Sequence, residues 1–106
     1  MKRHVMIDLE TLGTTPDSVI LTLGAIKFDP WDDSSTLTNA ENIKMDCFYQ
    51  RIDPSSFPES STIDEGTLKW WASQNQDVRQ EAFAEDNRYP IRTTLTDFYK
   101  WLGTFD

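Results

Sequence analysis

Two carboxylates stand two positions apart near the start of the chain. Asp8 and Glu10 follow the apolar run Val5-Met6-Ile7 and precede Thr11. Because alternate side chains of a β-strand share one face, Asp8 and Glu10 must point the same way, a few ångströms apart. Carboxylates so placed repel each other, and a bound hard cation or a shared proton relieves the repulsion; oxygen ligands of this type suit Mg²⁺ or Mn²⁺ better than zinc. The spacing alone is also common on solvated strand faces, but here the pair interrupts an apolar strand, which makes Asp8 and Glu10 candidate ligands of a divalent cation.

The segment that carries this pair is the first of three predicted strands. Residues 4–9 form a short apolar run, which we expect to be a buried strand interrupted by the two acids; polar residues 11–18, with Gly13, then form a loop. A longer apolar run over 19–28 predicts a second strand, with Gly24 at a bulge or a close backbone approach, and partial alternation over 43–52 predicts a third. Short polar connections favour an antiparallel meander, because a parallel crossover needs a dozen or more linking residues.

Helical spacing dominates the second half of the chain. Thr62 followed by Glu65 has the capping-box pattern, which predicts a helix with Trp71 on its apolar face. A second helix is expected over 77–85 and is broken by Pro90. The last expected helix covers 94–102, with an apolar stripe at i, i+3, i+4 and i+7. The stripe consists of Leu95, Phe98, Tyr99 and Leu102.

Length and composition bound the remaining possibilities. The 106 residues suffice for one compact domain over 1–106. The net charge of −8 argues against a protein that coats nucleic acid through a basic face, although divalent ions in a cleft can attract a phosphate locally. The single cysteine, Cys47, excludes an internal disulfide and is expected to be a buried thiol of a cytoplasmic protein. The N-terminal run is too short and too charged for a signal peptide or a membrane span.

Several motifs together resemble the DEDD 3′–5′ exonucleases, the DnaQ-like group of the RNase H-like superfamily. The first is Val5-Met6-Ile7-Asp8-Leu9-Glu10-Thr11-Leu12-Gly13, followed by Pro16 and the run 20–28. The second is Thr67-Leu68-Lys69-Trp70-Trp71-Ala72-Ser73-Gln74. This combination is similar to the phage and prophage branch related to exonuclease VIII and the phage exonuclease A group. The resemblance implies an α/β, RNase H-like fold that is partial here: the antiparallel meander and two to three helices, without the later parallel strands.

The resemblance also implies an activity and roles for residues. It implies hydrolysis of a phosphodiester at a nucleic-acid 3′ end with Mg²⁺ or Mn²⁺ in a two-metal site, where Asp8 and Glu10 are ligands. Thr11 and Leu12 would contact the terminal sugar and base, and Trp71 would line the same cleft, where a base can stack on an indole. Since Trp70 and Trp71 are adjacent on a helix, one is expected to anchor the core and the other to lie at the surface.

Parts of the family pattern have no convincing match. A second and a third catalytic Asp and a His or Tyr general base are missing; His4 is expected to be structural, and Asp106 in Gly103-Thr104-Phe105-Asp106 only superficially resembles a second motif. The domain is therefore expected to be shortened and inactive alone. Without the later strands, the edge of residues 5–7 would be unpaired, which predicts a homodimer or pairing with another chain.

Three interpretations stay open at the level of sequence. The first is a metal-dependent 3′–5′ exonuclease domain that acts on DNA or RNA 3′ ends. The second is a non-catalytic binding or inhibitor protein built on a shortened nuclease fold, whose acidic surface would suit a nucleic-acid mimic. The third is a structural domain in which Asp8 and Glu10 are remnants. Nothing in the sequence reads the 2′-hydroxyl, so DNA and RNA are not separated.

Overall fold

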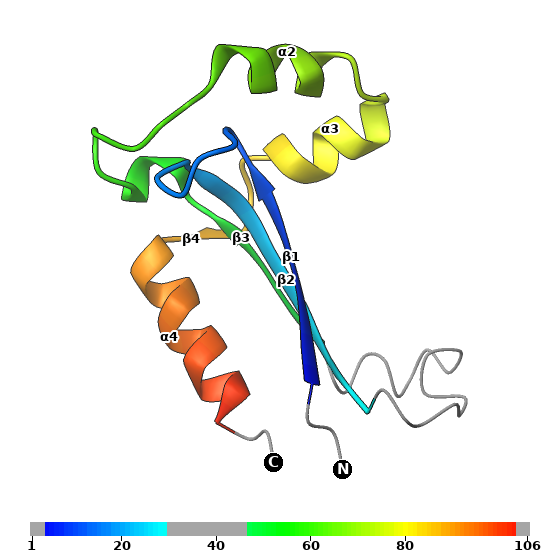
Figure 1. Ribbon diagram of the computed structural model, residues 1–106, viewed down its shortest axis with the longest axis vertical. Coiled ribbons are helices and arrows are strands. Elements are labelled where there is room, and N and C mark those ends of the chain that lie inside the picture. Colours follow the sequence, from blue (N-terminus) through cyan, green and yellow to red (C-terminus); the bar gives the residue numbers. More distant parts are fainter. Residues whose placement is uncertain (1–3, 30–46, 104–106) are drawn as a thin grey trace.

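The computed structural model describes residues 4–29 and 47–103. It shows an α/β fold with one mixed β-sheet and helices on both faces of the sheet (Figure 1). In chain order the elements are β1 (His4–Thr11), β2 (Ile20–Phe28), β3 (Cys47–Ile52), the 3₁₀ helix η2 (Pro54–Ser56), α2 (Glu65–Ala72), α3 (Gln76–Phe83), β4 (Arg88–Tyr89) and α4 (Ile91–Leu102). The sheet order is β1-β2-β3-β4. The predicted antiparallel meander of three strands and the three helices are confirmed; part of the third predicted strand, 43–46, lies outside the described residues.

The short strand β4 is an addition to the predicted fold. It pairs in parallel with β3 through Arg51 with Arg88 and Ile52 with Tyr89. It therefore lies at the opposite side of the sheet from β1. Among the strands that the structure describes, none lies beyond β1, so this strand has a neighbour on one side only.

The prediction that β1 is buried is wrong. Met6, Ile7 and Leu9 are 62%, 51% and 42% exposed, and β2 is the strand that enters the core. Cys47, expected to be buried, is also exposed. Gly24, expected at a bulge or a close backbone approach, pairs in regular register with Asp8 and Tyr49, and a Cβ there would make contacts of ordinary length. The register of β1 and β2 shifts between Glu10 and Thr11 instead.

The main core lies between β2 and the helices α2 and α3. It consists of Leu12, Val19, Leu21, Trp71 and Ala82, with Phe57 packed against them. The loop after β1 closes tightly over it, because Leu12 N–H donates to Val19 O and Asp64 N–H donates to Leu12 O. Gly13 is needed here, since a Cβ at this position would collide with the Ser18 side chain. The core therefore fixes the segment that directly follows Glu10.

Helix α4 covers the other face of the sheet, where Phe48 contacts Phe98 and Trp101. Lys27 Nζ donates to Trp101 O at 2.8 Å and lies 4.5 Å from the ring centroid of Trp101, a cation–π contact. The predicted apolar stripe of α4 is only partly right, because Leu95 and Tyr99 are 52% and 76% exposed. In the described part of the chain no helix has the length and apolar character to cross a membrane.

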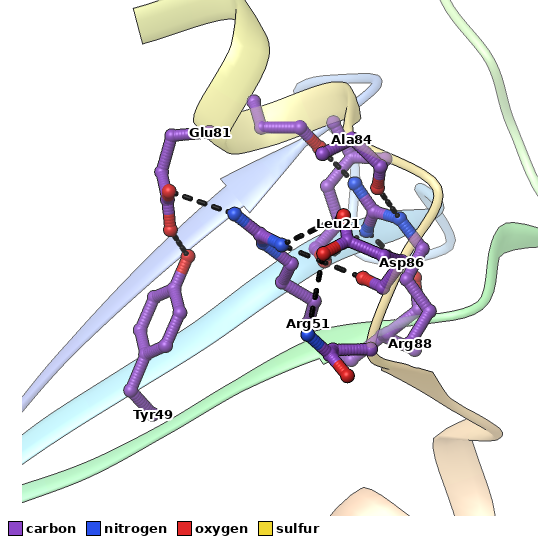
Figure 2. A network of polar contacts seen from close by, with 10 residues as sticks. Leu21, Tyr49, Arg51, Glu81, Ala84, Asp86 and Arg88 are labelled. Atoms are coloured by element: carbon purple, nitrogen blue, oxygen red, sulfur yellow. Dashed lines mark hydrogen bonds and ion pairs between the residues drawn. The ribbon is translucent and has the colours of Figure 1, made fainter. Parts of the chain in front are cut away.

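Arg88 ties the end of α3 to the sheet (Figure 2). Its Nε donates to Ala84 O at 2.6 Å and its Nη2 donates to Ala82 O, both at the C-terminal end of α3. Its Nη1 donates to Leu21 O and Ile52 O, each at 3.0 Å, on β2 and β3. One planar guanidinium thus satisfies four backbone acceptors, and burial lowers its pKa from the usual value. The position of α3 over the sheet depends on this residue.

Candidate active site

Two rows of side chains cross the sheet on one face. Because the register pairs residues directly across β1, β2 and β3, side chains two positions apart on each strand line up. The rows are Asp8–Gly24–Tyr49 and Glu10–Thr22–Arg51. The strand period correctly predicted that the two acids share a face, and the register adds Tyr49 and Arg51 on the far strand.

A cavity of about 440 Å³ lies over these rows, and we call it the trough. Its sheet side includes Asp8, Glu10, Gly24 and Tyr49. Helix α3 lines the other side with Asp77, Val78, Glu81 and Ala82. The two predicted catalytic residues therefore do open onto one cavity, and four carboxylates surround it.

The two carboxylates of β1 are close enough to affect each other. The pKa of Glu10 is raised above its usual value, first by burial and second by the charge of Asp8. A cation bound between the two would relieve this repulsion. Among the residues with described positions, however, no three His, Cys, Asp or Glu side chains come close enough to hold a metal together. The described residues therefore offer a pair of oxygen ligands, which fits part of a Mg²⁺ or Mn²⁺ site.

Glu81 of α3 lines the trough together with this pair. Two hydrogen bonds hold its carboxylate (Figure 2). Tyr49 Oη donates to Glu81 Oε1 at 2.6 Å, and Arg51 Nη2 donates to Glu81 Oε2 at 2.8 Å. These two hydrogen bonds, that of Tyr49 first, hold the pKa of Glu81 below its usual value. The pKa of Tyr49 is raised by burial and then by Glu81, so the phenol stays a proton donor at neutral pH. Glu81, Tyr49 and Arg51 were not identified as site residues from the sequence, although alternation along a strand over 43–52 places Tyr49 and Arg51 on the same face.

A second groove of about 550 Å³ runs along the other side of Glu10. Glu10, Thr11 and Gly13 line it together with the first turns of α2, including Thr67 and Trp70. Glu10 therefore stands between the groove and the trough. We call this second cavity the tryptophan groove.

One of the two adjacent tryptophans lies in the core and the other at the surface, as expected for neighbours on a helix. Trp71 is 3% exposed and its Nε1 donates to Thr11 O at 2.9 Å, whereas Trp70 is 53% exposed. Leu12 is 6% exposed and belongs to the core. Of the residues predicted to contact substrate, Thr11 and Trp71 line the groove, whereas Leu12 does not. The exposed ring is that of Trp70.

Two other residues considered in the sequence analysis are His4 and Asp106. The ring of His4 lies 5.8 Å from that of Phe28, at the end of β1 remote from Asp8, in agreement with a structural role. Asp106 lies outside the described residues.

A model of the Rv2179c-like 3′–5′ exoribonuclease domain family matches residues 3–105. The chain belongs to this family. No curated protein and no solved structure is significantly similar to it.

Membership in the Rv2179c-like family confirms the broad part of the sequence interpretation. The fold is that of a 3′–5′ exonuclease-type domain, a nuclease and hydrolase class that acts on nucleic acid. The match spans both the acidic pair of β1 and the tryptophans of α2. The narrower resemblance to the phage branch stays a prediction.

Proposed function

We propose that this chain provides the metal-binding half of a 3′–5′ exoribonuclease site, with Asp8 and Glu10 as ligands of Mg²⁺ or Mn²⁺. The observation that carries the proposal is the pair of carboxylates that opens onto one cavity at the end of β1. When bound, divalent ions supply a hydroxide nucleophile at neutral pH and stabilise the leaving oxygen. RNA is the proposed substrate because the family is described as exoribonucleases. The remaining ligands would come from outside the described residues or from a second copy.

The protein's own residues would orient the 3′ end. Trp71 fixes the carbonyl of Thr11, and the core packing of Leu12 fixes the next residue, so the backbone beside Glu10 is rigid. Preorganised groups of this kind hold a reacting bond without rearrangement during the reaction.

The test is calorimetric titration of Mn²⁺ into the chain, followed by digestion of a 5′-labelled oligoribonucleotide in the same buffer. Metal binding with stepwise shortening from the 3′ end is the expected result for a complete site. Metal binding without shortening would mean that further ligands must be added. Absence of metal binding would contradict the proposal.

Trp70 is the proposed stacking platform for a base in the tryptophan groove. Its ring is 53% exposed and lies next to Glu10 and Thr11. Since stacking on an aromatic side chain contributes about 1–3 kcal/mol, Trp70→Ala should weaken binding of an oligoribonucleotide by about 5- to 150-fold. Trp70→Phe, which keeps an aromatic face, is the matched control for fluorescence anisotropy. Equal losses in both variants would argue against stacking.

The open edge of β1 is the proposed contact with a second chain. Ile7 and Leu9 of β1 are half exposed, and β1 has one neighbouring strand among the described residues. Unpaired edges of this kind can pair with a strand of another chain. Sedimentation velocity should therefore show self-association that Ile7→Lys abolishes. Leu68→Lys, at a position of α2 with 41% exposure, is the control and should leave it unchanged. A well-folded monomer at high concentration would count against this contact.

A further inference from the structure

The trough has two chemically different sides. On one side lie the carboxylates of β1. On the other lie Tyr49 of β3 and Glu81 of α3, and Arg51 donates a hydrogen bond to Glu81. The two outer strands are two strand spacings apart, roughly 10 Å. Gly24 lines the trough between these strands and has no side chain, so the floor of the trough is low there. The space that remains, about 440 Å³, lies within the size range of small-molecule sites.

Glu81 has the features of a preorganised hydrogen-bond acceptor. Each of its carboxylate oxygens receives one hydrogen bond, from Tyr49 or from Arg51, and each oxygen has room for a second. The Glu81 side chain is 58% exposed, so these free acceptor positions are reachable. Its lowered pKa means that it stays ionised at neutral pH. A ligand that approaches Glu81 from the trough must therefore bring a donor.

The charges around Arg51 indicate whether the group that contacts Glu81 is a phosphate or a hydroxyl. Arg51 contacts two carboxylates, Glu81 at 2.8 Å and Asp86 at 3.4 Å (Figure 2). Its positive charge is thus already matched, and Arg51 itself does not line the trough. Among the described residues, the lining of the trough contains no cation. A second anion is disfavoured on this side, whereas a sugar hydroxyl can donate to the carboxylate.

We propose that the trough binds the ribose of the 3′-terminal nucleotide and that Glu81 accepts a hydrogen bond from its 2′-hydroxyl. The proposal rests on the exoribonuclease function proposed above and adds the residue that separates RNA from DNA. The 2′-hydroxyl is the group by which a protein distinguishes the two. Carboxylates recognise the same hydroxyl in dinucleotide-binding folds. Tyr49 and Arg51 act as positioning residues that hold the carboxylate in place.

The experiment compares two mononucleotides that differ only in the 2′-hydroxyl. Adenosine 5′-monophosphate and its 2′-deoxy counterpart are titrated into the full chain in the presence of Mn²⁺, after the binding of Mn²⁺ alone has been measured. The wild-type chain should bind the ribonucleotide about tenfold more tightly, as expected for a hydrogen bond to a charged acceptor. Glu81→Gln should reduce this ratio below about threefold and change the affinity for the deoxynucleotide by less than about twofold.

Two further variants separate recognition from folding. Glu59→Gln makes the same exchange at an exposed position and should keep the wild-type ratio. Gly24→Val fills the floor of the trough, and β-branched residues favour strands, so it should fold but lose both nucleotides. A ratio near one in the wild-type chain, or a ratio that survives Glu81→Gln, would overturn the proposal. If Mn²⁺ itself fails to bind, the proposed metal site is wrong as well, whereas Mn²⁺ binding without sugar discrimination contradicts the ribose site alone.

Discussion

Exchanging Asp8 for asparagine and Glu10 for glutamine is expected to abolish Mn²⁺ binding and raise the melting temperature of the metal-free chain. Both substitutions keep the shape of the side chains and remove their charges. Removing a residue that only hydrogen-bonds a metal ligand already lowers metal affinity by about 10- to 100-fold. Loss of both ligands should therefore lower the affinity by more than about 100-fold. Hydrolysis that depends on the metal should fall by at least about a thousandfold. Burial and, second, the charge of Asp8 raise the pKa of Glu10, so removing the two charges should raise the melting temperature by about 2–4 °C.

The expected loss of Mn²⁺ affinity and the expected gain in melting temperature have opposite signs, so together they distinguish a ligand pair from a structural pair. A merely structural pair would lose stability when altered, whereas a ligand pair loses the metal and gains stability. Mn²⁺ calorimetry, thermal melting and digestion of a labelled oligoribonucleotide check the three quantities. The control is Glu59→Gln with Glu85→Gln, which removes two charges from exposed positions. If the protein were a binding or inhibitor protein, the Asp8/Glu10 variant would still bind its partner. Mn²⁺ binding retained in the variant would mean that Asp8 and Glu10 are not the metal ligands.

The sequence predicted those parts of the fold that depend on local pattern. Alternation and short connections were enough for the antiparallel meander, and the strand period was enough to bring Asp8 and Glu10 to one cavity. The capping-box prediction for helix α2, with Thr62 as the N-cap, was wrong. The N-cap of this helix is Asp64, which accepts from Thr67 N–H, because Thr62 is used elsewhere: its amide and hydroxyl donate to Asp17.

Features that depend on contacts distant in sequence were not predictable. Helix α4 begins at Ile91, directly after Pro90, three residues before the expected start. The face that it buries is selected by Phe48 on β3, so Thr94 is fully buried while Tyr99 is exposed. In the same way Glu81 reaches the trough through its bond to Tyr49, 32 residues away. Sequence periodicity indicates which face of an element is apolar, but the neighbour that covers that face is chosen by the tertiary structure.

Replacing Arg88 by methionine is expected to lower the free energy of unfolding by about 3–5 kcal/mol. Four backbone carbonyls, two at the end of α3 and two on the sheet, would lose their donor at once. Each buried acceptor left without a partner costs about 1–3 kcal/mol, and water that enters the gap recovers part of it. Arg88→Lys should cost less, because a lysine ammonium has three donors on a flexible stem and does not reproduce the planar fork.

Chemical denaturation followed by tryptophan fluorescence measures these changes. Arg79→Met, at an exposed position of α3, is the control and should stay within about 0.5 kcal/mol of the wild type. Because α3 carries Glu81, the lysine variant should also lose discrimination between ribo- and deoxynucleotide while it keeps the Mn²⁺ affinity of the β1 carboxylates. An Arg88→Met chain as stable as the wild type would mean that water replaces the guanidinium, and that α3 is held over the trough by the contacts of Tyr49 and Arg51 with Glu81 instead.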